Sequence, residues 1–436
     1  MPILTSQRNQ HILFLILLIV YGTLFYFITT DQLRLDFSSF YSASNVLSWH
    51  ANPYQVLQTT YFPTIKYLSP NPNPPSLLML FIPLSKLNYH TSVIIWYVLS
   101  LTLGVITALT AFALVFSQSQ VKQHKLIALI LFFSLFSTLI DTATMQLGSF
   151  TAFFLIIGYY VYKQGHFVLA AVLWGIIASL KIFPCLLLFY ILRQRHYKML
   201  AIMIATLSIS WLIPWFIYGT QVYSDYFKLL PHMLWFGDSW NASLYGFLFR
   251  LFVDGHDKTP HLLVVQSLYG LLSMVSLLWY FKSMKAHQTR YLDGMDNKHH
   301  QPFCLTLVMM LFLSPMGWIY YFPLIFLPML VTWSQSRTTK PFIGLVCLFL
   351  INFPMGYVMS KNMTTLFEKL TLYSFPFYGL LLLIHLLSKN YRTERCNRNH
   401  QQNLMLPITS ILAFGIVVVL FSLLWRFHIA FSSKWA

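Results

Sequence analysis

An apolar run close to the start of the chain decides the class of fold, because residues 11–30 read HILFLILLIVYGTLFYFITT. A helix rises 1.5 Å per residue, so about twenty residues match the roughly 30 Å hydrocarbon core of a bilayer. Arg8 lies before the run, and no small-x-small cleavage site follows it. The run is therefore typical of a first transmembrane helix with a cytoplasmic N-terminus, and not of a removable signal peptide.

The composition of the whole chain favours the same class. Of 436 residues, 57% are hydrophobic, 18% aromatic and 9% charged, whereas soluble domains carry roughly a quarter charged residues. The 28 Lys and Arg give a formal net charge of +17, but they lie mostly in short loops between apolar runs. This is the positive-inside pattern and not a nucleic-acid-binding surface. We expect an all-α polytopic membrane protein that contacts membrane lipids and binds no nucleic acid.

The placement of basic loops indicates how the chain crosses the membrane. One span over 167–193 would leave the basic loop 193–198 outside, whereas two short helices that meet at Lys181 return it to the cytoplasm. Cytoplasmic segments then hold 17 Lys and Arg and 3 acidic residues, and external segments hold 10 and 7. The count predicts about 11–13 transmembrane helices. The remaining runs lie at 91–117, 126–144, 149–163, 199–219, 262–282, 301–313, 318–333, 341–357, 371–388 and 404–425.

The chain is expected to form one transmembrane domain over 1–436. The first long polar segment contains two apolar stretches too short to span, 36–49 and 76–87, which are typical of interfacial helices. The expected parts are a first external loop with these helices (31–90), a second external loop (220–261) and the C-terminal transmembrane helices (262–436).

Two charged residues need a chemical explanation. Lys181 lies inside an apolar run, where a lysine requires a partner or a wet cavity, and Pro184 permits a helix break beside it. It either holds a phosphate as a point charge or extends from a helix end to water. Asp36 begins the first interfacial helix, where it either caps the helix or accepts a proton from an attacking hydroxyl. Asp31 is a weaker candidate for that base.

Three further elements allow two interpretations each. Arg250 can contact a phosphate or a lipid headgroup. Asn241 can orient a sugar hydroxyl or cap a turn. Trp318, Tyr320 and Tyr321 follow a Ser-Pro pair, and they suit a sugar-binding platform or an aromatic belt. The predicted topology places all of these elements on the outer side, toward which the Lys181 turn points.

This convergence indicates the class of donor. No Walker loop, glycine-rich fingerprint or acidic metal cluster is visible on the cytoplasmic side. A reaction on the outer face must draw its donor from the membrane, because nucleotide donors are absent there. A sugar carried on a lipid phosphate fits this requirement, and no metal or other cofactor is predicted. The alternatives are a transporter or flippase of lipid-linked saccharides and a non-catalytic assembly partner.

Five motifs in register, between about residues 30 and 335, resemble those of glycosyltransferase family 87, the polyprenyl-phosphate-mannose-type α-mannosyltransferases. They are Asp36–Phe37–Ser38–Ser39–Phe40–Tyr41–Ser42–Ala43–Ser44 with Asn52–Pro53–Tyr54, Pro74–Pro75, Leu180–Lys181–Ile182–Phe183–Pro184, Asn241 with Arg250, and Ser314–Pro315–x–x–Trp318.

The resemblance implies a GT-C fold and an inverting transfer of a hexose, commonly mannose. The donor would be a polyprenyl-phosphate sugar and the acceptor a glycolipid or glycan, on the external face of the plasma (inner) membrane. Asp36 takes the general-base position, and Lys181 and Arg250 would contact the donor phosphate. Residues expected to contact sugar or acceptor are Tyr41, Tyr54, Asn241, Trp318, Tyr320 and Tyr321.

Overall fold

The computed structural model describes residues 7–30, 36–62, 66–233, 235–253, 262–284, 300–335, 341–363, 365–388, 412–413 and 415–417. Its elements, with η for a 3-10 helix, begin with α1 (Gln7–Thr30), α2 (Asp36–Ser48), β1 (Leu57–Gln58), β2 (Tyr67–Leu68), α3 (Pro75–Ser85), α4 (Tyr89–Val115), α5 (Gln118–Phe133), α6 (Phe136–Thr144), α7 (Gly148–Lys163), α8 (Phe167–Leu180), η1 (Phe183–Leu186), α9 (Leu187–Arg193) and α10 (Tyr197–Tyr218). They continue with α11 (Gln221–Leu229), η2 (Leu230–His232), η3 (Trp235–Gly237), α12 (Leu244–Phe252), α13 (Leu262–Ser283), α14 (Gln301–Leu313), η5 (Ile319–Ile325), α15 (Phe326–Gln335), α16 (Pro341–Ile351), η6 (Ser360–Asn362), α17 (Leu366–Leu370), η7 (Leu372–Ser374) and α18 (Phe375–Ser388).

The predicted all-α membrane architecture is confirmed. Within the described residues, α1, α4, α10, α13 and the stretch Leu366–Ser388 are long and apolar enough to cross a bilayer, and α5 with α6 forms a sixth span if the bent pair is counted as one. Large apolar side chains on these helices point outward, such as Phe216, 78% exposed, and Met274, 64% exposed. Lipid is the solvent that such surfaces require. Shorter apolar helices occupy most of the other predicted runs.

Two predicted runs differ from the observed helices. The run 126–144 is bent by 64° between α5 and α6. The bend is fixed by Asn352, whose side-chain oxygen accepts the Phe136 N–H at 2.6 Å and so satisfies the first turn of α6. Its own segment leaves the helix at that point, so the predicted run 341–357 is helical only to Ile351. The run 404–425 lies almost entirely outside the described residues, as does Asp31.

The predicted break at Lys181 is present, and the chain turns back on itself there. Lys181 ends α8 with an extended backbone, φ −140° and ψ 125°. The ring of Phe167, at the start of α8, lies 4.8 Å from that of His196, just after α9. The Trp174 and Tyr190 rings, nearer the turn, are 6.1 Å apart. Helices α8 and α9 therefore form an antiparallel hairpin with Lys181 at its apex.

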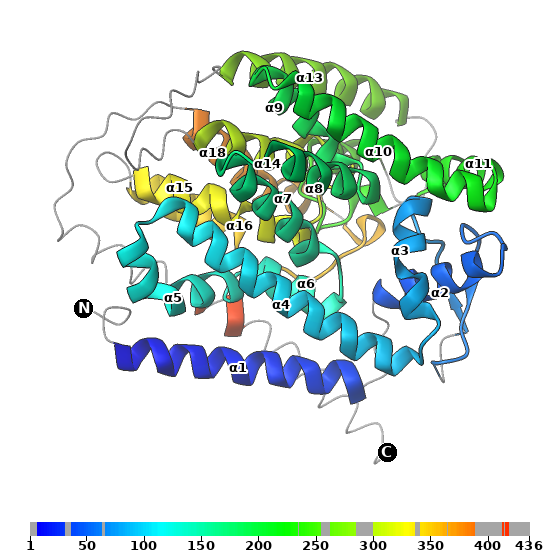
Figure 1. Cartoon of the computed structure of the whole chain (residues 1–436), viewed down its shortest axis with the longest axis horizontal. Helices are drawn as coiled ribbons and strands as arrows, with labels where there is room; N and C mark the ends of the chain where they lie inside the picture. Colours follow the sequence, from blue (N-terminus) through cyan, green and yellow to red (C-terminus); the bar gives the residue numbers. More distant parts are fainter. Residues whose placement is uncertain are drawn as a thin grey trace.

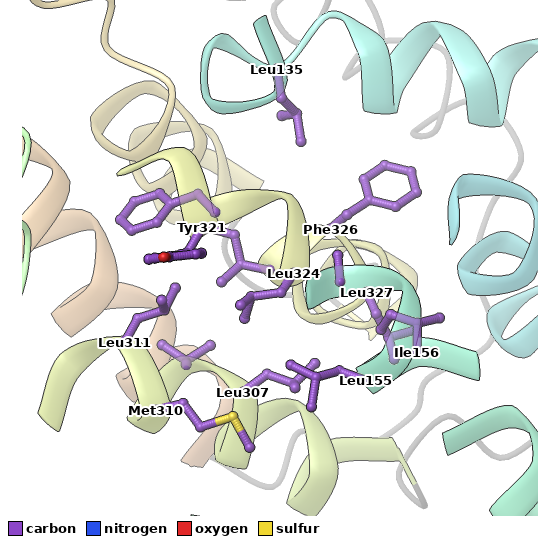
Figure 2. Close-up of a cluster of buried hydrophobic side chains, with 14 of the residues drawn as sticks. Leu135, Leu155, Ile156, Leu307, Met310, Leu311, Tyr321, Leu324, Phe326 and Leu327 are labelled. Carbon is purple, nitrogen blue, oxygen red and sulfur yellow. The ribbon is translucent and has the colours of Figure 1, made fainter. Parts of the chain in front are cut away.

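One end of the bundle gathers α2, α3, α11 and the two-stranded β1–β2 pair, on the right in Figure 1. Beside it, buried aliphatic side chains from α7, α14 and α15 pack into a continuous core (Figure 2). Tyr321 stands on this core, where Leu311 and Leu324 are fully buried. Because this core is close-packed, the residues attached to it at the α2–α3 end have fixed positions.

Candidate active site

A cavity of about 1520 Å³ lies at the α2–α3 end of the bundle. It is lined by the start of α2, the proline-rich segment 68–74, the turn between α6 and α7, the apex of the α8–α9 hairpin, and segments 314–321 and 355–359. Ligand pockets typically measure 300–1,000 Å³. The cavity is therefore large enough for two substrates at once.

Asp36, the first residue of α2, faces this cavity. Its carboxylate accepts a hydrogen bond of 2.7 Å from the Gln146 side-chain amide, across 110 residues of sequence. A carboxylate held in this way is oriented to accept a proton from a substrate in the cavity. The described side chains that interact electrostatically with it include Lys181, Tyr320, Tyr321 and Tyr357.

Lys181 lies on the same cavity, at the hairpin apex. Its ammonium donates a hydrogen bond to the side-chain oxygen of Asn73 and lies 5.3 Å from the ring centre of Tyr321 and 5.9 Å from that of Phe40. Asn73 is itself fixed, because Asn71 accepts both its main-chain N–H (3.0 Å) and its side-chain amide (2.6 Å). The amine is therefore held at the cavity wall, where its protonated form can attract an anion.

The aromatic residues after the Ser-Pro pair form another wall of the cavity. The chain turns tightly at Gly317, where a Cβ would lie 2.2 Å from a main-chain oxygen. A short antiparallel bridge to the segment around Trp240 then fixes the next residues, with N–H···O distances of 2.9 Å. The Trp318 and Tyr320 rings stack with their centres 5.9 Å apart and an interplanar angle of 8°. Such flat faces suit sugar rings.

Arg250 does not line the cavity. Its guanidinium is fully buried beneath α12 and donates to the main-chain oxygens of Asp238 (2.8 Å), Gly237 (3.2 Å) and Asn241 (3.4 Å). Burial lowers the pKa of Arg250 to about 10, and the Asp238 carboxylate partly offsets this effect. The guanidinium stays charged at neutral pH and ties the 237–241 segment to α12. The expected contact with a donor phosphate is not supported by this position.

Three other residues expected to contact sugar or acceptor do not line the cavity, and their side chains bond to the main chain instead. Tyr41 donates its hydroxyl to a main-chain oxygen just after α3, at 2.7 Å. Tyr54 donates to the main-chain oxygen of Asn73 at 3.1 Å. Asn241 is fully buried and donates to the carbonyl of Pro315 at 2.8 Å. Tyr54 and Asn241 therefore support the segments that carry the Lys181 partner and the Trp318 wall.

Polar and aromatic residues that line the cavity without being among the expected site residues include Asn73, Gln146, Trp240 and Tyr357. Asn73 belongs to the proline-rich stretch, and the only signal for Gln146 is a polar side chain between two apolar runs. Among the described residues no group of three or more His, Cys, Asp and Glu is arranged to hold a metal ion.

Fold and site together define a class: an all-α polytopic membrane protein with a carboxylate, an ammonium and aromatic rings around one large cavity. The chain belongs to glycosyltransferase family 87, whose sequence model matches residues 71–293, about half of the chain. It is therefore a glycosyltransferase that uses a sugar donor and an acceptor, and the expected membership of this family is confirmed. Neither the curated proteins nor the solved structures contain a match.

Proposed function

We propose that this glycosyltransferase moves a hexose, with mannose as the first candidate, from a polyprenyl-phosphate donor to a glycolipid or glycan acceptor, with inversion. The observation that carries the proposal is that Asp36 and Lys181, far apart in sequence, line one cavity and interact electrostatically. A base and a cation at one site are the groups that transfer from a phosphate-linked sugar needs.

In the proposed step, the acceptor oxygen attacks the anomeric carbon as Asp36 takes the hydroxyl proton. The bond from that carbon to the phosphate oxygen breaks, and its electron pair leaves with the polyprenyl phosphate. Lys181 stabilises the negative charge on the departing group. Trp318 and Tyr320 line the cavity, where aromatic rings can pack against the sugar. Attack from the side opposite the phosphate inverts the configuration.

The apolar part of the cavity supports a lipid-linked donor. Beyond Lys181 its wall continues along the hairpin with Leu186 and Phe189, and across to Leu277 of α13 and Met310 of α14. Phe189 is 44% exposed, so this wall reaches the lipid-facing surface of the bundle. An isoprenoid chain gains roughly 25 cal/mol for each Å² of apolar surface removed from water. A transporter also needs such a wall, but family membership favours the enzyme.

The charge distribution supports a cavity on the external side. Among the described residues, the acidic side chains at the cavity end are Asp36, Asp141, Asp225, Asp238 and Glu368. The opposite ends of the helices carry, among the described residues, no Asp or Glu. Their charged side chains are all basic: Arg8, Lys122, Lys125, Lys163, Arg193, Arg195, Lys198 and Lys282. Basic ends remain in the cytoplasm by the positive-inside rule. The loops 31–90 and 220–261 would then face outward.

The test replaces the base. Purified Asp36→Asn protein, assayed with radiolabelled polyprenyl-phosphate mannose, should lose about 10²–10⁴-fold in transfer rate while still binding the donor. The matched control is Asp225→Asn, because Asp225 lies on α11 at the same end without lining the cavity. Wild-type turnover by Asp36→Asn would refute the proposal. Glucose- and arabinose-linked donors identify the sugar, and lipid movement across vesicles without any transfer would favour a transporter.

A further inference from the structure

We propose that Gln146 is a bifunctional amide of this site: its Nε2 positions Asp36, and its Oε1 accepts a hydrogen bond from a hydroxyl of a bound sugar. The proposal rests on the proposed role of Asp36 as the base. Gln146 lies on the cavity wall beside Asp36, and its Nε2 donates to the Asp36 Oδ2 at 2.7 Å.

The backbone directs this side chain toward the cavity. Helix α6 ends at Thr144, and Met145 adopts the left-handed conformation with φ 57°. The N–H of Gln146 then donates to the main-chain oxygen of Asp141 at 2.9 Å, which closes the turn. Left-handed backbone is uncommon for residues other than Gly and Asn, so the surrounding packing must hold it. The position of Gln146 is thus built into the end of α6.

A second set of contacts keeps the turn rigid. The Asp141 carboxylate accepts the N–H groups of Gly148 (2.6 Å) and Ser149 (2.7 Å) and the Ser149 hydroxyl (2.7 Å). These bonds satisfy free N–H groups in the first turn of α7. Gly148 lies directly against the main-chain oxygen of Tyr320. The turn is therefore fixed against the segment that carries the aromatic wall, as a positioning group requires.

The chemistry of the pair fixes which way the amide faces. An ionised carboxylate only accepts hydrogen bonds, so the amide must present its nitrogen to Asp36 and its oxygen away from it. Gln146 is 7% exposed, and its Oε1 is buried with no hydrogen-bond partner among the described residues. Buried acceptors are normally satisfied. The missing donor at this place is supplied by a sugar hydroxyl, because sugars are the substrates of this enzyme class and carry O–H donors.

The test separates the two roles by kinetics. A hydrogen bond to the charged form lowers the pKa of a carboxyl group, so Gln146→Leu should move the acid limb of the kcat profile to higher pH and lower kcat about 10–100-fold. One substrate, the donor or the acceptor, loses the hydrogen bond from its hydroxyl to Gln146 Oε1. The KM of that substrate should rise several-fold. The matched control is Gln164→Leu, because Gln164 is exposed at the other end of α7. It should leave kcat, KM and the pH profile unchanged.

Gln146→Glu provides a second variant of nearly the same shape. Two carboxylates side by side repel at neutral pH, whereas the protonated acid can still donate to Asp36. Its residual activity should therefore increase as the pH is lowered, the opposite of Gln146→Leu. The other groups that face Asp36 are unchanged in both variants, so they contribute equally: Lys181, Tyr320, Tyr321 and Tyr357.

The outcomes are distinguishable from failure of the proposed function. The probe is radiolabelled polyprenyl-phosphate mannose with the acceptor lipids of a native membrane extract, and melting in detergent checks folding. A lower kcat with an unmoved acid limb in both variants overturns the positioning role. Unchanged KM values for donor and acceptor overturn the hydroxyl contact. If Asp36→Asn is itself fully active, the proposed function fails first, whatever the Gln146 variants do.

Discussion

Gly148→Ala offers a direct test of how the cavity is assembled. An added Cβ at Gly148 would lie 1.8 Å from the main-chain oxygen of Tyr320 and 2.7 Å from the Asp141 carboxylate, whereas real Cβ contacts essentially never fall below 3.0 Å. The closer pair must therefore separate by about 1.2 Å. Neither atom of this pair can move aside easily. One is the main-chain oxygen of Tyr320, and the other is a Cβ attached directly to the backbone of α7.

The size of the effect follows from that displacement. Overpacking of a close-packed interior costs about 1–3 kcal/mol of folding free energy, more than the few tenths to ~1 kcal/mol that replacing Gly with Ala gains in a helix. A shift of about 1 Å also separates the Tyr320 wall from the turn that carries Gln146, and misplacement on this scale can cost about 10²-fold in rate. We expect lower stability together with a transfer rate reduced about 10²-fold.

The assay compares melting in detergent and transfer from radiolabelled polyprenyl-phosphate mannose. Gly22→Ala is the matched control, because a Cβ on Gly22 of α1 would meet no atom within 4 Å. It should melt at or above the wild-type temperature and keep full activity. If Gly148→Ala melts like Gly22→Ala and transfers sugar at the wild-type rate, the close approach of α7 and η5 is wrong.

Three further predictions follow from the placement of the charged side chains. Lys181→Met should reduce kcat about 10²–10³-fold, the loss seen when one charge-stabilising group is removed, whereas Lys86→Met, at an exposed lysine outside the cavity, should not; equal activities would contradict the phosphate role. Arg250→Met should instead lower folding stability by about 1–3 kcal/mol for each acceptor left unsatisfied, because it removes the donor to the buried main-chain oxygens of Gly237, Asp238 and Asn241. A stable variant with a selectively raised donor KM would restore the phosphate contact. In a cysteine-free background, Lys86→Cys should react with an impermeant maleimide in intact cells, and Gln164→Cys should react only after permeabilisation. The reason is that the two positions lie at opposite ends of the bundle. Labelling of Gln164→Cys from outside would show that the proposed orientation is inverted.

The structure shows which of the predicted residues line the cavity. Asp36, Lys181, Trp318, Tyr320 and Tyr321 line one cavity, whereas Arg250 is buried among carbonyl oxygens. The sequence could not separate the two cations. Lys181 and Arg250 both lie close to apolar stretches, and residue type alone does not say whether a cation meets a cavity or a set of carbonyls.

The features that could be predicted before the fold was known depend on short stretches of the chain. Apolar runs of sufficient length require membrane helices, since a bilayer satisfies no free backbone group. A lysine followed by Pro184 in an apolar run permits a break, and that break is observed at the hairpin apex. The short motifs also indicated the family to which the chain belongs. All of these follow from neighbours along the chain, which sequence records directly.

The contacts between side chains that are distant in sequence depend on the folded structure. Gln146 reaches Asp36 across 110 residues, and Asn73 reaches Lys181 across 108. Neither pair has a signal in sequence, because an amide between two apolar runs and an asparagine between prolines fit a loop equally well. Their partners depend on the left-handed turn at Met145 and on how the hairpin packs against α2 and α3. Packing fixes the direction in which each side chain points. It therefore decides which of the residues suggested by composition and spacing line the cavity together.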